Sequence, residues 1–195
     1  MTIFIPCQCR INKRMKIQKV NTLLWFAALI TILISCKPTD HSDAGNYLLS
    51  FADHRTNECG YKNSKGDVVI PAGRYGMCFT DTFRNYAIVL KPTVGFIAID
   101  RQETVLYDVY PFDNGPDPVA DGLFRIQRDG KIGYADAVAG NVVIDPQYNC
   151  AYPFENGIAK VSTDCTTEAD GEHTTWLSDH WMYIDKTGKK MDMPK

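Results

Sequence analysis

The stretch Gly130–Val161, which reads GKIGYADAVAGNVVIDPQYNCAYPFENGIAKV, decides the fold that the sequence predicts. Its final run, Ile158–Val161, alternates with period two, as a half-buried β-strand does. The dipeptide Asn156-Gly157 in front of that run is a turn sequence. Pro146 and Pro153 stand beside the predicted strands rather than inside them, where a proline would remove a ladder hydrogen bond. The stretch therefore predicts short strands separated by turns.

The same pattern occurs twice before this stretch and once, truncated, after it. A polar turn that ends in glycine recurs as Lys62–Gly66 and as Asp185–Gly188. We find no amphipathic helical stretch after Cys36. One such unit cannot bury its own apolar face, so at least three must pack together. The aromatic residue that follows the glycine position of each unit recurs as Tyr61, Phe96, Tyr134 and Tyr183.

This pattern resembles the WG repeat, also called the KWG repeat. Its unit reads roughly W-G-Y-I-D-x-x-G-x-x-V-I-x-P-x-Y, followed by an aromatic-rich stretch that ends in F-x-x-G-x-A-x-V. Residues 130–161 match it best, and the resemblance covers about residues 46–191. It implies an architecture and brings no shared catalytic residues.

The chain departs from the repeat at the two positions that give it its name. Cys59, Val94 and Ile132 stand where the repeat has tryptophan, and where Trp181 keeps the tryptophan, Met182 replaces the glycine. The second unit also lacks the Ile-x-Pro sequence and contains an inserted segment, Asn-Gly-Pro-Asp-Pro at 114–118.

The N-terminal segment has the pattern of a lipoprotein signal peptide. Only Thr31 interrupts the apolar run from Leu23 to Ile34, which is too short to cross a bilayer but fits the core of a secretory signal. The run ends in Leu-Ile-Ser-Cys at 33–36, which resembles a lipobox. That resemblance implies cleavage before Cys36 and lipidation of its thiol.

We therefore expect residues 1–35 to be a signal peptide, with 1–14 an upstream start-site error and Met15 the true start. Residues 36–45 are interpreted as the lipidated Cys36 followed by a polar tether. Lys37 favours the outer membrane, by resemblance to the known sorting rule. The expected localisation is the bacterial cell envelope, as an outer-membrane lipoprotein that is periplasmic or surface-exposed. The alternative is a short buried helix with a coincidental cysteine.

The expected fold class is all-β. Tandem WG-type β-hairpin repeats would form one elongated, curved antiparallel β body after the signal peptide. The repeat domain would span 46–195, with units at about 46–90, 91–127, 128–162 and 180–191 and an insertion at 163–179. Two rows of aromatic residues would stack in register along it, namely Tyr61, Phe96, Tyr134 and Tyr183 in one row and Phe83, Phe112 and Phe154 in the other.

Charge excludes one class of partner. From Cys36 onward the chain holds 16 basic and 23 acidic residues, a net charge of −7, which leaves no basic footprint for nucleic acid. The sequence contains no nucleophile elbow and no phosphate-cradling glycine loop ahead of a helix. We therefore expect no catalytic residues, no metal and no cofactor.

Four cysteines remain after Cys36, namely Cys59, Cys78, Cys150 and Cys165. In an oxidising compartment this number favours two disulfides, with three possible pairings. The repeat alignment places Cys78 and Cys150 at nearly the same point, which favours Cys59–Cys78 and Cys150–Cys165. Free buried thiols and a zinc site stay open as alternatives.

The insertion is the one unusual segment, and it collects the candidate ligand contacts. Histidines and carboxylates there are compatible with a divalent cation or a partner-contact loop, whereas Asp170-Gly171 is compatible with a plain hairpin tip. Aromatic residues beside polar ones are also compatible with stacking on sugar rings, with repeat core as the alternative. The candidates near the insertion are Asp170, Glu172, His173, Trp176, His180 and Trp181, and the further aromatic candidates are Tyr107, Tyr110, Tyr148 and Tyr152.

We expect a non-catalytic, lipid-anchored envelope protein that binds or scaffolds another envelope protein through its β-repeat surface. The alternative is glycan binding, to a polysaccharide or peptidoglycan, through exposed aromatics near 163–181. An enzyme is a third hypothesis, and it would require a histidine within hydrogen-bond reach of a nucleophile, or paired carboxylates in a cleft.

Overall fold

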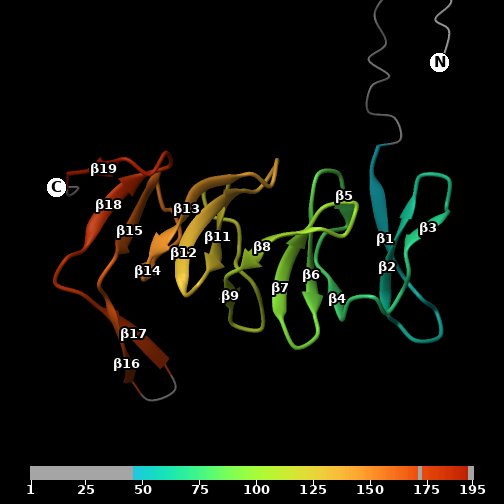
Figure 1. The fold of residues 1–195 in the computed structure, drawn as a ribbon, viewed down its shortest axis with the longest axis horizontal. Helices are drawn as coiled ribbons and strands as arrows, with labels where there is room; N and C mark the ends of the chain where they lie inside the picture. Colours follow the sequence, from blue (N-terminus) through green and yellow to red (C-terminus); the bar gives the residue numbers. More distant parts are fainter. Residues whose placement is uncertain (1–45, 171–172, 193–195) are drawn as a thin grey trace, which may run out of the picture. The chain divides into compact units, whose positions relative to one another are not determined.

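The computed structural model describes residues 46–170 and 173–192, which form nineteen β-strands and no helix (Figure 1). Within this part of the chain, no helix long and apolar enough to cross a membrane is found. Every pairing between the strands is antiparallel. The predicted all-β, antiparallel fold is confirmed. The expected signal peptide, Cys36 and the tether lie outside the described residues.

The repeat in the structure is a three-stranded meander that occurs four times. The first meander lies within the first sequence unit, and each of the other three joins the last strand of one unit to the first two strands of the next. The four meanders are β1 (Leu48–Ala52), β2 (Cys59–Asn63) and β3 (Val68–Ile70); β6 (Ala87–Lys91), β7 (Gly95–Ile99) and β8 (Val105–Val109); β11 (Leu123–Arg128), β12 (Lys131–Asp136) and β13 (Val142–Tyr148); and β15 (Ile158–Ser162), β18 (Met182–Asp185) and β19 (Lys190–Met191).

Seven further strands lie between the meanders or, for the last two, within the fourth meander, and pairing assembles all the strands into five sheets. These further strands are β4 (Met77–Cys78), β5 (Thr82–Phe83), β9 (Pro111–Phe112), β10 (Gly115–Pro116), β14 (Cys150–Ala151), β16 (Thr166–Asp170) and β17 (His173–Leu177). The largest sheet has the order β13-β12-β11-β8-β7-β6-β4, and two four-stranded sheets have the orders β3-β2-β1-β5 and β14-β15-β18-β19. The pairs β9–β10 and β16–β17 each form a separate two-stranded sheet.

One turn recurs in all four meanders, between the second and third strands. A side-chain carbonyl or carboxylate oxygen accepts the backbone N–H two residues ahead, at 2.9 Å in each case. This Asx contact fixes the turn without help from the rest of the fold. The residues that supply the oxygen are Asn63, Asp100, Asp136 and Asp185.

The glycine that gives the WG repeat half its name is required by a close backbone contact. A Cβ on Gly133 would lie 2.3 Å from the carbonyl oxygen of Ile144, and a Cβ on Gly60 would lie 2.6 Å from that of Ile70. In both meanders the third strand crosses the glycine beside a register shift. Only glycine lets the two backbones approach this closely. Pro146, predicted to stand beside a strand, lies inside β13 at this irregularity, where the regular ladder is interrupted.

The prediction that aromatic residues stack along two rows is wrong for the described residues, because the contacts found join one member of each row. Tyr61 packs edge-on against Phe83 and Tyr134 against Phe154, with ring centroids 5.3 Å and 4.7 Å apart. Phe112 was expected to share this packing, and that expectation is wrong, because its side chain is 53% exposed. The inserted segment of the second unit supplies β10, which pairs with β9, the strand that contains Phe112.

Two disulfides join neighbouring elements. Cys59 in β2 is bonded to Cys78 in β4, and Cys150 in β14 is bonded to Cys165, which precedes β16. The Cα atoms of each pair are 6.0 Å apart, within the usual range for a disulfide. This is the pairing that the repeat alignment favours.

The close approach at Gly133 generates a stability prediction. Gly133→Ala places a methyl group against the backbone of β13, which cannot yield as a flexible side chain can. We expect the free energy of unfolding to fall by about 3 kcal/mol in urea titrations followed by circular dichroism.

Gly76→Ala is the matched control, because the added Cβ would lie 3.5 Å from the side chain of Leu90 in ordinary contact. Its free energy of unfolding is expected to change by less than about 1 kcal/mol. Equal losses in the two variants would show that the backbone approach at Gly133 is not the cause.

Candidate functional site

Four partly exposed aromatic residues form a connected cluster, called here the aromatic surface: Tyr110, Tyr152, Trp176 and Trp181. The ring centroid of Tyr152 lies 5.2 Å from that of Trp176 and 5.6 Å from that of Trp181. The ring centroid of Trp176 also lies 6.4 Å from that of Tyr110. The four residues come from three separate regions of the sequence, so the cluster exists only in the folded chain.

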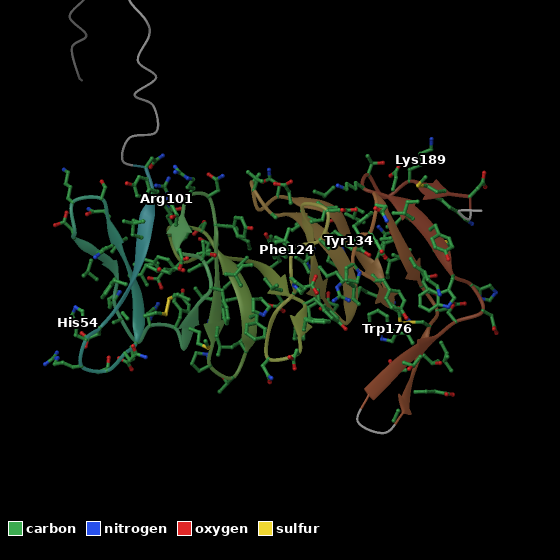
Figure 2. The ribbon with its side chains drawn as sticks, turned by 180° about the vertical axis from the view of Figure 1, so that it is seen from behind. His54, Arg101, Phe124, Tyr134, Trp176 and Lys189 are labelled. Atoms are coloured by element: carbon green, nitrogen blue, oxygen red, sulfur yellow. A yellow bond between two sulfur atoms is a disulfide. The ribbon has the colours of Figure 1, made fainter. Side chains whose placement is uncertain are left out.

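Trp176 is carried by the hairpin β16–β17, called here the arm, which is inserted between β15 and β18 (Figure 2). The Cys150–Cys165 disulfide ties the start of the arm to β14. A second attachment lies at Asp164, whose carboxylate accepts hydrogen bonds from the hydroxyls of Ser162 and Ser178, at 2.7 and 2.9 Å. These hydrogen bonds lower the pKa of Asp164 below its ordinary value.

Tyr110 and Tyr152 occupy the same position in consecutive repeats. The backbone N–H of Tyr110 donates to the carbonyl of Arg125 at 3.0 Å, and that of Tyr152 donates to the carbonyl of Lys160 at 2.9 Å. The side chains repeat the arrangement, because the Arg125 guanidinium lies 4.4 Å from the centroid of the Tyr110 ring and the Lys160 ammonium lies 5.8 Å from that of Tyr152. A proline follows each tyrosine. The structure thus builds the same Tyr-Pro-cation group twice.

The first of these cations is fixed by a buried ion pair. Arg125 and Asp117 are 4% exposed, and the guanidinium contacts the carboxylate through Nε and Nη2. The other carboxylate oxygen accepts the backbone N–H of Arg125 at 2.7 Å, and Nη1 donates to the carbonyl of Ala151 at 3.1 Å. Asp117 belongs to the segment inserted in the second unit, which therefore positions a cation beneath Tyr110. Burial raises the pKa of the Tyr110 phenol.

The second cation faces an open hollow of about 650 Å³. Lys160 also lies 4.4 Å from the centroid of the Trp181 ring. Carboxylate, amide and ammonium groups stand around an otherwise apolar lining, a composition typical of small-molecule sites. The hollow is lined by Tyr152, Pro153, Glu155, Asn156, Ile158, Lys160 and Tyr183.

A smaller hollow of about 280 Å³ also borders Tyr152. It shares Tyr152 and Pro153 with the larger hollow, so the two are adjacent. Its remaining lining comes from the second unit and the arm, namely Tyr110, Pro111, Phe112, Asp113, Arg125 and Trp176.

The structure brings two of the six candidate contacts near the insertion together. Trp176 and Trp181 both pack against Tyr152 and both are half-buried. His180 lies at the base of the arm instead, with its Nδ1 against Asp164 and its side chain 76% exposed. Asp170 and His173 face each other as the last paired residues of the arm, and their side chains, like Glu172 altogether, lie outside what the structure describes.

Of the further aromatic candidates, two belong to the core. Tyr107 and Tyr148 are only 6% and 5% exposed, which agrees with the alternative that they are repeat core. Burial raises the pKa of both phenols. Tyr110 and Tyr152 are the two that reach the site.

Lys160, Arg125 and the two prolines of the site were not singled out from the sequence. The signal was present, because Tyr110-Pro111 aligns with Tyr152-Pro153 and Arg125 with Lys160 in the repeat. Core positions and ligand-facing positions recur at the same spacing, so recurrence alone does not separate them.

Ser162, Asp164, Ser178 and His180 form a polar cluster at the base of the arm. Its arrangement differs from that of a nucleophile–histidine–carboxylate relay. In such a relay the imidazole lies between the hydroxyl and the carboxylate. Here the hydroxyls of Ser162 and Ser178 and the imidazole of His180 all contact the carboxylate of Asp164. Within 46–170 and 173–192, no three histidine, cysteine or acidic side chains are grouped to hold a metal.

Comparison with known families identifies the central segment. Residues 132–164 match the family model described as a WG containing repeat. The chain contains a WG repeat. The matched WG repeat runs from β12 through β15, so it includes Tyr134, Tyr152 and Lys160. No curated protein and no solved structure shows significant similarity to the chain.

The buried pair beneath Tyr110 gives a second stability prediction. Asp117→Ala leaves the guanidinium of Arg125 buried without its counter-charge, so we expect the free energy of unfolding to fall by about 3–5 kcal/mol in urea titrations. Arg74→Ala removes the exposed ion pair with Glu103 and serves as the control, with an expected loss of less than about 1 kcal/mol. A loss of that small size in Asp117→Ala would contradict the anchoring role assigned to Asp117.

Proposed function

We propose that this protein is a non-catalytic binding protein of the bacterial cell envelope, anchored to the outer membrane through a lipid on Cys36, and that its aromatic surface binds a glycan. The observation that carries the proposal is the position of Trp176 and Trp181. Both are partly exposed and pack against Tyr152, which lines an open hollow with a polar rim.

The chemistry of the hollow fits a sugar ring. A sugar presents apolar C–H faces and a rim of hydroxyl groups, and aromatic rings provide flat apolar surfaces that match those faces. The carboxylate of Glu155, the amide of Asn156 and the ammonium of Lys160 line the same hollow. Together they offer acceptors and donors for hydroxyl groups, which also orient the ligand.

The prolines of the site disfavour a peptide that would add to the sheet as a further strand. Such a peptide needs backbone N–H and C=O groups along the edge it joins. β14 is an edge strand of its sheet, and two residues beyond it stands Pro153, which has no N–H to offer. The surface that follows β14 is therefore better suited to stacking than to strand addition.

The sequence before the described residues supports the location. The apolar run Leu23–Ile34 followed by Ser35 and Cys36 fits an exported, lipidated protein, and the two disulfides of the fold fit an oxidising compartment.

Trp181→Ala tests the proposal. Truncation removes the ring that packs on both Tyr152 and Lys160, so binding to insoluble cellulose, chitin and isolated peptidoglycan sacculi is expected to weaken at least about tenfold for each material that the parent chain binds. The measurement is co-sedimentation of the full chain with each material.

Phe51→Ala is the control, since Phe51 is a half-buried aromatic in β1 that borders a different hollow. It should sediment like the parent chain. Failure of the parent chain to bind any of the three materials would contradict glycan binding.

A protein partner remains the second candidate, and a different observation favours it. The last strand of each of the first three meanders exposes two neighbouring aliphatic side chains, and each of the six is at least 37% exposed. Exposed apolar side chains are typical of protein interaction surfaces, and these six are called here the row because they recur at the same place in the repeat. The row consists of Val68, Val69, Val105, Leu106, Val142 and Val143.

Charge placed in that row tests the second candidate. Val69→Asp and Val143→Asp are expected to reduce the amount of any envelope protein that crosslinks to the full chain by at least about tenfold, because the carboxylate would be desolvated at the contact. Val138→Asp, at an 84% exposed turn position, is the control. Unchanged crosslinking in both row variants would contradict a role for this row.

A further inference from the structure

We propose that the two hollows that share Tyr152 and Pro153 are tandem subsites for one polysaccharide chain, which is bound along its length rather than at its end. This inference rests on the proposed function and adds to it the kind of ligand, namely a polymer with a repeating unit, and the direction in which that polymer runs across the repeats.

The first argument is that the two hollows are built from equivalent residues. The Tyr110-Pro111 pair with Arg125 borders one hollow, and the Tyr152-Pro153 pair with Lys160 borders the other. Each tyrosine is held by the same backbone hydrogen bond to its basic partner. Each hollow therefore presents a Tyr-Pro pair supported by a basic residue, buried in the case of Arg125 and partly exposed in the case of Lys160. Two such pairs side by side suit a ligand that also repeats.

The second argument is that the two hollows are continuous. Tyr152 and Pro153 line both, and Trp176 packs on the tyrosine of each, with centroid distances of 6.4 Å to Tyr110 and 5.2 Å to Tyr152. A ligand in one hollow therefore contacts Tyr152 and Pro153, which also line the other hollow. The aromatic order along this path is Tyr110, Trp176, Tyr152 and Trp181.

The third argument concerns the openness of the path. Tyr152, which both hollows share, is 38% exposed, and Phe112 at the far side of the smaller hollow is 53% exposed. Side chains this exposed leave room for a chain to continue past them. Recognition of a chain end would instead need an enclosed pocket that surrounds most of the ligand.

The first repeat provides an internal comparison. Phe79 donates its backbone N–H to the carbonyl of Ile88 at 2.9 Å, so this pair stands where Tyr152 and Lys160 stand. The partner is an uncharged aliphatic residue, and the Phe79 ring packs on Phe96 at 5.4 Å. The Tyr-Pro-cation group is therefore specific to the second and third repeats, and Phe79 is a matched control position.

Two linked subsites make affinity depend on ligand length. Once the first sugars occupy the Tyr152 hollow, the following sugars reach the Tyr110 hollow as part of the same molecule, at a high effective concentration. We expect the dissociation constant to fall at least about tenfold between a disaccharide and a hexasaccharide. Removal of the Tyr110 subsite is expected to abolish this gain with ligand length.

The experiment is isothermal titration calorimetry of the full chain with chito-, cello- and xylo-oligosaccharides, from disaccharide to hexasaccharide. The variants are Tyr110→Ala and, because Tyr110 also packs on Arg125, the milder Phe112→Ala, which lies at an exposed position of the same hollow. Phe79→Ala is the control and should keep the length dependence of the parent chain. Circular dichroism establishes that each variant is folded.

The outcomes separate the inference from the proposed function on which it rests. Two results would overturn the tandem subsites while glycan binding stands. One is an affinity of the parent chain that does not depend on oligosaccharide length. The other is an affinity gain with length that survives in both Tyr110→Ala and Phe112→Ala. No binding of any oligosaccharide by the parent chain would overturn both. A gain with length that both variants lose and Phe79→Ala keeps would establish the tandem subsites.

Discussion

The hydroxyl of Tyr134 donates a hydrogen bond to the backbone carbonyl of Tyr152 at 2.7 Å, and the placement of the site depends on this contact. Tyr134 is fully buried, its ring packs edge-on against Phe154, and burial raises the pKa of its phenol, which therefore remains a donor. The first repeat makes a similar contact one residue further along, from the Tyr61 hydroxyl to the carbonyl of Thr80, which follows Phe79, at 3.0 Å. A core residue of the WG repeat thus fixes the backbone from which a surface aromatic projects.

The second repeat shows how the architecture adapts when this interaction is missing. Its equivalent residue is Phe96, which has no hydroxyl, and its Phe112 lies at the surface. The inserted segment replaces the lost contact with the buried pair of Asp117 and Arg125, whose guanidinium then supports Tyr110 from below. The second repeat thus holds Tyr110 with the buried ion pair, and the third repeat holds Tyr152 with the buried phenol of Tyr134. Two degenerate repeats thereby place a tyrosine at the same position of the surface.

Much of the fold could be predicted from the sequence, because its determinants are local. Turn residues such as Asp185 and Gly188, and the aromatic residue after each glycine position, act within a few residues and recur visibly. The strand partners and the site could not be predicted in the same way. Phe112 shares its sequence pattern with Phe154 but not its burial, since the insertion that begins two residues later pairs with the strand that contains Phe112. Similarly, Trp176 gains its role only because the arm folds back onto two tyrosines that are remote in sequence.

The central claim is that the aromatic surface, held in place by the repeats, is where the ligand binds. The chain has three tryptophans, and with Trp25→Phe the only ones left are Trp176 and Trp181, both in that surface. Titration of this variant with a bound oligosaccharide is expected to shift the tryptophan emission to shorter wavelength, saturating at the concentration that calorimetry gives for binding. Binding detected by calorimetry without any change in emission would place the ligand elsewhere and contradict the account.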